Sequence, residues 1–209
     1  MPINSAELKE TDIRAKFQIK DWESLVALGE NFAQTLNEES RATLNREVIT
    51  IGLIAPTLSG KSSFARGVYS GLGSEYKPLQ MAMIAVNGSW DTDTEKQGLI
   101  RHFDMAVQPD EDDPDNFPMH WRTLEQGLGA NGIQIVEHAR KFRDPIYSCI
   151  IEIDKTENTD NFERVLTVYA DDEFASTPAF RSFLADSAHY ALPLTRKGDQ
   201  DYDHPDITP

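Results

Sequence analysis

The chain has 209 residues, a length typical of one domain, and its 35 acidic against 20 basic side chains give a net charge of −15. A surface this acidic repels the phosphate backbone of nucleic acids, so direct and autonomous binding to nucleic acid is not expected. We expect protein partners instead. No stretch is long enough to span a bilayer, so no membrane contact is expected. The start lacks a signal-peptide pattern and Cys149 is the single cysteine, so we expect a cytoplasmic protein with a buried, inert thiol.

The chain opens with a polar segment, residues 1–15, that we expect to be poorly ordered. Residues 16–20 alternate as a short strand, and Asp21 follows as a helix N-cap. Apolar side chains at helical spacing then predict one buried stripe on that helix: Leu25, Leu28, Phe32 and Leu36. A strand and a helix therefore precede the central part of the chain.

The central stretch is 48–64, in which a β-branched apolar run leads through a short turn to Gly-Lys-Ser at 60–62. Phe64, Val68 and Leu72 follow on one helical face, and Gly73 stands where the helix would stop. Strand, loop, Gly-Lys-Ser and helix together are the context of a phosphate-binding P-loop. The predicted nucleotide-binding residues are those of the loop and the first helical turn: Ala55, Thr57, Leu58, Ser59, Gly60, Lys61, Ser62 and Ser63.

In a P-loop, backbone N–H groups and the helix N-terminus surround a triphosphate. Lys61 would reach the β- and γ-phosphates of ATP, and the Ser62 hydroxyl would be a ligand of Mg²⁺. The motif's first glycine is replaced by Ala55, which resists the positive φ that glycine adopts freely. The alternative is an ordinary strand-to-helix turn with a surface lysine, and the full strand–loop–helix context favours the P-loop.

Three further apolar runs predict strands, at 79–86, 99–103 and 133–136, and Asp104 and Glu137 directly follow the second and the third. Ligands of an α/β sheet collect at the carboxyl ends of its strands. Both acids could therefore face a bound nucleotide, where one carboxylate can hold Mg²⁺ directly or through water and a second can orient an attacking water. Acids at strand ends also cap turns, but two of them together beside Gly-Lys-Ser favour the functional interpretation.

The two nearby histidines are treated differently. His102 is predicted to be packed, or hydrogen-bonded to backbone, rather than catalytic. The role of His138 stays open, as does the purpose of the acidic loop at 109–115.

The C-terminal part predicts a helix at 119–128 with Trp121 in the core, then a hairpin of antiparallel edge strands at 148–153 and 165–170. Thr177 is expected to open a last helix. The overall prediction is an α/β protein with a P-loop NTPase fold. It is a three-layer sandwich with a mostly parallel central sheet and an antiparallel C-terminal hairpin. Residues 16–190 would form the single domain, between a flexible N-terminus (1–15) and a flexible acidic tail (191–209).

Several of these segments, in this order, resemble the TsaE family, the small bacterial ATPases that help to make threonylcarbamoyladenosine on tRNA. The segments that carry the resemblance are 27–33, Gly-Lys-Ser with 64–67 and 72–73, His-Phe-Asp at 102–104, Ile-Val-Glu at 135–137, and the hairpin containing Arg164. The resemblance covers roughly residues 16–170. It implies ATP and Mg²⁺ bound by Lys61, Ser62 and Asp104, with Glu137 as an active-site acid. It also implies weak or partner-stimulated hydrolysis, and work with the proteins of the threonylcarbamoyl transfer complex.

The sequence also departs from that family. Its loop has Ala55 and Leu58 where glycine is usual, and residues 80–83 lack the family's switch threonine, for which Thr92 and Thr94 are weak substitutes. Ala106-Val107 replaces Tyr-Arg, and His138 replaces a tryptophan. Two alternatives therefore stay open. One is a small-molecule kinase that uses Arg140, Lys141 and Arg143 as its basic cluster, and the other is a non-catalytic interaction protein with a decayed nucleotide site.

Overall fold

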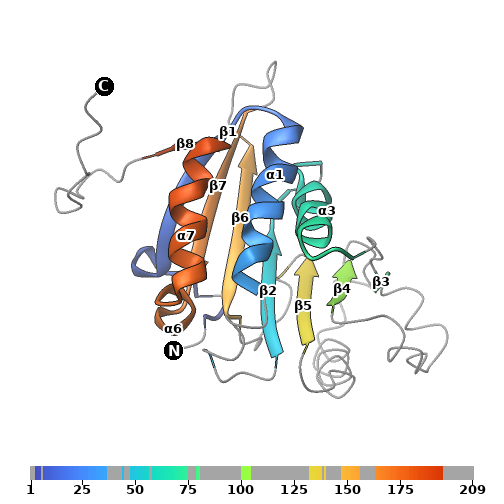
Figure 1. Ribbon diagram of the computed structural model, residues 1–209, viewed down its shortest axis with the longest axis vertical. Helices are drawn as coiled ribbons and strands as arrows, with labels where there is room; N and C mark the ends of the chain where they lie inside the picture. The colour runs from blue at the N-terminus through green and yellow to red at the C-terminus, as the bar shows by residue number, and fades with distance from the viewer. Residues whose placement is uncertain are drawn as a thin grey trace.

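The structure is a computed structural model of the whole chain (Figure 1). It describes residues 3–5, 7–36, 44, 48–56, 58–74, 79–80, 100–104, 132–137, 139, 147–155 and 163–194. Most of the predicted 79–86 strand, the acidic loop, the 119–128 helix and the tail beyond Leu194 therefore lie outside the described residues. No helix in the described part is long and apolar enough to cross a membrane.

The described strands form one eight-stranded sheet with the order β3-β4-β5-β2-β6-β7-β1-β8. Their bounds are β1 (Ile13–Ile19), β2 (Val48–Ile54), β3 (Leu79–Gln80), β4 (Ile100–Asp104), β5 (Gly132–Glu137), β6 (Cys149–Lys155), β7 (Arg164–Ala170) and β8 (Leu192–Pro193). The first five strands of that order pair in parallel, from β3 to β6. The predicted α/β fold, with a parallel core that includes β2, the strand before Gly-Lys-Ser, is confirmed.

The hairpin of β6 and β7 is antiparallel, as predicted, but these are not edge strands. β6 also pairs in parallel with β2, and β7 also pairs with β1, which in turn carries β8. β1 lies far from β7 in the sequence, so nothing local could indicate this pairing. The near-continuous burial of both strands reflects their interior position.

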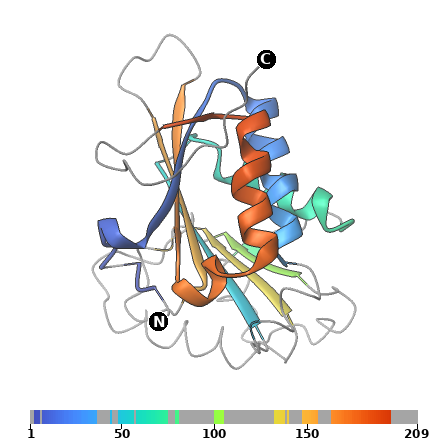
Figure 2. The ribbon, with the colours of Figure 1, turned by 60° about the vertical axis from the view of Figure 1, so that its left-hand side comes forward.

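Three helices cover one face of the sheet: α1 (Trp22–Ala33), α3 (Lys61–Gly71) and α7 (Pro178–Asp186). Figure 2 views the sheet nearly edge-on, with these helices on one side of it. Asp21 caps α1 by accepting a 2.7 Å hydrogen bond from the Ser24 N–H, as predicted. Hydrogen bonds from Ser24, from its side chain and then its backbone, lower the pKa of the Asp21 carboxyl. Thr177 caps α7 in the same way.

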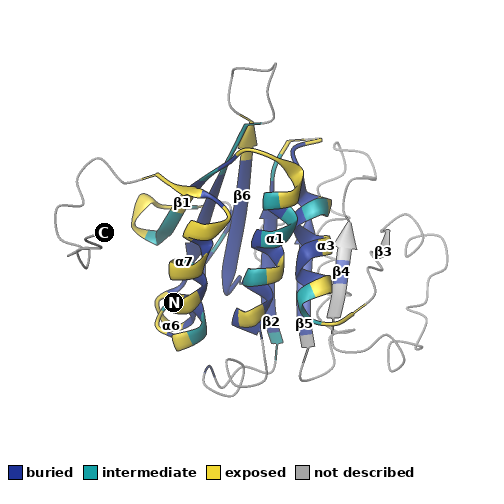
Figure 3. Ribbon diagram, turned by 45° about the horizontal axis from the view of Figure 1, so that its top comes forward, coloured by how far each residue is buried: buried dark blue, intermediate teal, exposed yellow. Residues whose placement is uncertain are grey.

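Between these helices and the sheet lies the main hydrophobic core, drawn dark blue in Figure 3. Alternate residues of the central strands face it, among them Ile51, Leu53 and Ile135. Because side chains alternate across a strand, Gly52 faces away from the helices. A Cβ there would lie 2.9 Å from Ala139 Cβ and 3.0 Å from Tyr147 Cε1. The second face is therefore also packed at this position.

α1 and α3 pack so closely that their backbones touch. A Cβ on Gly67 would lie 2.0 Å from the Val26 carbonyl oxygen, and one on Gly29 would lie 2.3 Å from the Phe64 carbonyl oxygen. Real Cβ atoms do not approach backbone this closely, so both positions require glycine. The contact fixes α3, which begins with Lys61, against its neighbour.

The N-terminal residues differ from the expectation of poor order. β1 begins at Ile13, before the predicted 16–20 strand, and a short 3₁₀ turn, η1 (Glu10–Asp12), precedes it. Ile3 is buried and pairs with Tyr147 in an antiparallel bridge. Burial of an apolar side chain against a strand far along the chain gives this segment a place that its own composition did not indicate. The proposed domain limits themselves stay a prediction.

Candidate functional site

The loop between β2 and α3 has the backbone geometry of a tight strand-to-helix turn. Gly60 stands at the N-cap of α3 with φ +112°, a region that favours glycine. A Cβ at Gly60 would also lie 2.3 Å from the Leu25 side chain. Leu58 has φ +60° and is the only non-glycine residue in the described part of the chain with a positive φ. Ser59 is buried and its hydroxyl donates to the Pro56 carbonyl, which closes the loop on itself.

Lys61 is buried at the first position of α3, with 7% of its surface exposed. Its Nζ donates hydrogen bonds to two carbonyls of the same loop, at 2.9 Å to Ala55 and 3.1 Å to Pro56. A surface lysine on an ordinary turn would extend into water instead. The ammonium group is thus held over the loop, beside the first turn of α3, whose N–H groups have no partner within a helix.

Glu137 ends β5 and is 2% exposed, so its carboxylate is held by side chains rather than by water. Its Oε1 accepts from the Ser62 hydroxyl at 3.4 Å and lies 3.1 Å from His102 Nε2. In the histidine tautomer with the hydrogen on Nε2, His102 donates this hydrogen bond to the Glu137 carboxylate. The predicted residue Ser62, which follows Lys61 in α3, therefore contacts the predicted acid Glu137.

His102 is fully buried and packs against Tyr69 of α3, with ring centroids 5.9 Å apart. The prediction that His102 is packed is confirmed, and the Glu137 carboxylate is a polar partner that the sequence did not indicate. The sequence signal that could have indicated a role for His102 is the alternation of side chains along a strand. Residues 102 and 104 of β4 are two positions apart, and alternation puts both positions on one face of the sheet.

Asp104 is the last residue of β4, and the register of β4 and β5 continues from Phe103–Val136 to place residue 104 level with Glu137. The two strand ends therefore lie side by side at the carboxyl edge of the sheet, as predicted. Of the other predicted residues, Ala55 lies at the end of β2 against the core and Ser63 lies half-buried in the first turn of α3. Thr57, Thr92, Thr94, His138 and the basic cluster at 140–143 lie outside the described residues.

Trp22 is a neighbour of the loop that sequence reasoning missed. It is the first residue of α1 and is 41% exposed, and its ring edge would lie 2.9 Å from a Cβ on Gly60. The Arg164 guanidinium of β7 lies over the Trp22 ring, 5.8 Å from its centroid. Three segments far apart in the sequence thus meet at the mouth of the loop.

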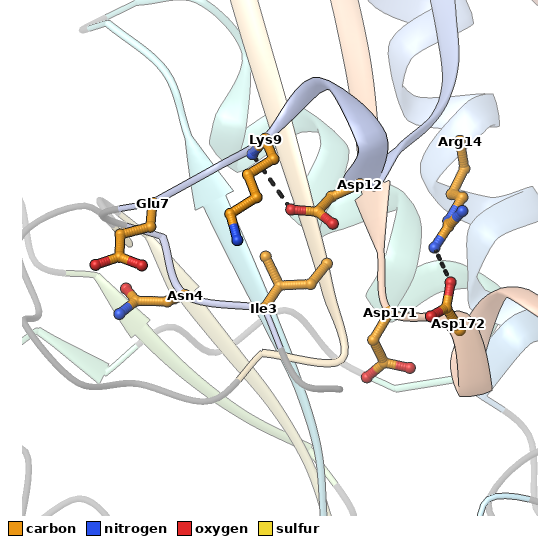
Figure 4. Close-up of a pocket in the computed structure, with 8 residues that line it drawn as sticks. All are labelled: Ile3, Asn4, Glu7, Lys9, Asp12, Arg14, Asp171 and Asp172. Carbon is orange, nitrogen blue, oxygen red and sulfur yellow. Dashed lines mark hydrogen bonds and ion pairs between the residues drawn. The ribbon is translucent and has the colours of Figure 1, made fainter.

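A separate cavity of about 190 Å³ lies at the other end of the sheet (Figure 4). Its walls include Ile3, Arg14 and Asp172, and Arg14 pairs with Asp172 at 2.6 Å. It adjoins the start of β6, whereas the loop follows the end of β2, so it is not part of the site. Cys149 also lies at the start of β6. Burial, and then the nearby Asp171 charge, raise the pKa of its thiol, in keeping with an inert cysteine.

Comparison with known proteins gives little beyond the fold. No protein-family model matches the chain, and no curated protein sequence matches it. Among solved structures, the crystal structure of Bacillus subtilis YdiB is similar in backbone, with 13% sequence identity and a TM-score of 0.44. The alignment covers 85% of this chain and 97% of that one.

Proposed function

We propose that this chain binds ATP with Mg²⁺ at the β2–α3 loop and is a weak or partner-stimulated ATPase. The observation that carries the proposal is the cluster of Lys61, Ser62 and Glu137 at the carboxyl edge of the parallel strands. Lys61 is held over the loop, and Ser62 lies between the loop and the buried acid. A cation, a hydroxyl and a carboxylate in this order are the groups that phosphoryl transfer needs.

The residues fit a magnesium ion by their chemistry. Mg²⁺ prefers oxygen ligands and is commonly bound through a hydroxyl, a carboxylate and phosphate oxygens. Ser62 supplies the hydroxyl and Asp104, level with Glu137 at the end of β4, supplies the carboxylate. When bound, the ion would neutralise charge on the phosphates. Lys61 and the loop amides would stabilise the charge that develops on the transferred group.

In this proposal Glu137 orients the attacking water. His102 is a positioning residue, because its bond to Oε1 and its packing on Tyr69 fix the direction of the carboxylate. The proposal also includes the proteins with which this chain acts. The motif resemblance to TsaE supports action beside the proteins of threonylcarbamoyl transfer, and the net charge of −15 favours contact with tRNA through a protein rather than directly.

The test is calorimetric titration of ATP and of ADP, with and without Mg²⁺, on the wild type, Lys61→Ala and Lys9→Ala. Lys9 lines the cavity at the far end of the sheet, so its variant loses the same charge away from the loop. We expect magnesium-dependent binding that Lys61→Ala abolishes and Lys9→Ala keeps. Equal ATP affinity in all three proteins would refute the assignment of the loop.

The same experiment separates the alternatives. A wild type that binds neither nucleotide would favour a non-catalytic interaction protein. If ATP binds, a screen of metabolites for phosphate transfer distinguishes a small-molecule kinase from a hydrolase. Pull-downs with and without ATP would then test the proposed protein partners.

A further inference from the structure

We propose that Trp22, backed by Arg164, is the surface on which the base of the bound nucleoside triphosphate stacks. This inference rests on the proposed function, because it places the base beside a loop that holds the phosphates. It assigns a specificity role to two residues that lie outside the P-loop motif. The argument uses the position, exposure and packing of the tryptophan.

The first step is position. Trp22 is in contact range of Gly60, the residue directly before Lys61, because a Cβ on that glycine would lie 2.9 Å from Cζ3 of the ring. A nucleotide whose phosphates lie against Gly60 and Lys61 must extend its sugar and base out of the loop across a neighbouring surface. α1 and α3 lie side by side and both begin at the upper end of the sheet in Figure 1, so the start of α1 is such a surface.

The second step is exposure. Tryptophan is highly buried on average, and the apolar stripe of α1 is fully buried at Leu25, Leu28 and Phe32. Trp22 instead keeps 41% of its surface exposed. Aromatic rings stack with any nucleobase because every base has a π-face, and Trp offers the largest ring.

The third step is the arginine. Arg164 begins β7, level with Ile19 of β1 and Lys155 of β6. It shares its face with Leu166 and Val168, which belong to the core under the helices. Its guanidinium lies over the indole ring at 5.8 Å, and such cation–π contacts favour one ring orientation. The ring is therefore held in place before a ligand arrives, and the cation also suits a ligand with negative phosphates.

The experiment compares ATP with inorganic tripolyphosphate, which has the phosphates but no base. Calorimetric affinities are measured with Mg²⁺ for the wild type, Trp22→Ala, Trp22→Phe and Tyr190→Ala. Tyr190 is an aromatic of matched exposure, 42%, on the connection from α7 to β8. We expect Trp22→Ala to weaken ATP roughly tenfold or more and to leave tripolyphosphate unchanged. Trp22→Phe should keep most of the ATP affinity, and Tyr190→Ala should change neither.

A second readout does not depend on the alanine variant folding. ATP should quench the tryptophan fluorescence of the wild type, tripolyphosphate should not, and Trp22→Phe should lose the quench. If Trp22→Ala weakens ATP and tripolyphosphate alike, or weakens neither, the stacking role is wrong while the phosphate loop stands. If the wild type binds neither ligand, the proposed function falls and this inference falls with it.

Discussion

The backbone contact between α1 and α3 makes Gly67→Ala the sharpest test of the fold. The added Cβ would lie 2.0 Å from the Val26 carbonyl oxygen, and ordinary contact begins near 3.4 Å, so the helices must separate by about 1.4 Å. No rotamer relieves this clash, because the backbone of residue 67 fixes the position of Cβ and its partner is a backbone oxygen. Overpacking costs about 1–3 kcal/mol and this case belongs at the upper end, while alanine returns roughly 1 kcal/mol of helix propensity. The net loss is about 2 kcal/mol of unfolding free energy.

For a chain of this length, that loss corresponds to a fall in melting temperature of roughly 4–8 °C, measured by circular dichroism and checked by urea denaturation. Gly73→Ala is the control, since Gly73 has φ +66° and nothing within 4 Å of its Cβ position. It should lose only about 1 kcal/mol, from left-handed strain. Melting of Gly67→Ala at or above the wild-type temperature would contradict the packing of these helices.

Three more variants test the loop and its surroundings. Glu137→Gln should keep ATP binding and lose most hydrolysis, at least about a hundredfold, in a phosphate-release assay, and unchanged turnover would remove Glu137 from the mechanism. Asp21→Ala should lose about 1 kcal/mol at pH 7. Because the pKa of the Asp21 carboxyl is lower in the folded protein than the unfolded value of about 3.9, the charge-dependent part of this difference should be fully present above about pH 4 and be lost as the pH falls through the folded pKa; a stability difference that is as large in acid as at pH 7 would contradict the charged cap. Leu58→Gly should raise the unfolding free energy by roughly 0.5–1 kcal/mol, since relief of left-handed strain exceeds the added freedom of the unfolded chain, and a loss of stability in denaturant titration would show that Leu58 is not strained.

Local signals predicted most of the elements near the loop. The β-branched run ending at Ile54, the Asp21 cap and the helix that stops before Gly73 all depend on neighbours in sequence, and each was placed within a few residues. The interior position of β6 and β7 was not predictable in this way. It results from the pairing of β7 with β1 and of β6 with β2, both much earlier in the chain, and no alternation pattern records which strand lies beside which.

The residues of the site also fall into two groups: those that local sequence indicated and those that only the fold brings together. Lys61 and Ser62 are adjacent in a motif, and Glu137 ends an apolar run, so residue type and position indicated all three. The contacts of His102 and Trp22 arise only from the fold. His102 meets Glu137 through strand pairing, and Trp22 meets Gly60 through the packing of α1 on α3. Residues of this second kind tune a site, and a single sequence gives little indication of them.

The structure of the loop shows why alanine is tolerated at residue 55, the motif's first glycine position. Ala55 replaces the motif's first glycine, and alanine would be strained if that position needed a positive φ. In the structure Ala55 does not have one, and the left-handed conformations fall on Leu58 and Gly60 instead. Ala55 contributes its carbonyl to Lys61, which any residue can do. The strain of this loop is therefore at Leu58, whose side chain is 80% exposed and gains little from burial. The replacement of glycine by Ala55 is therefore no argument against nucleotide binding.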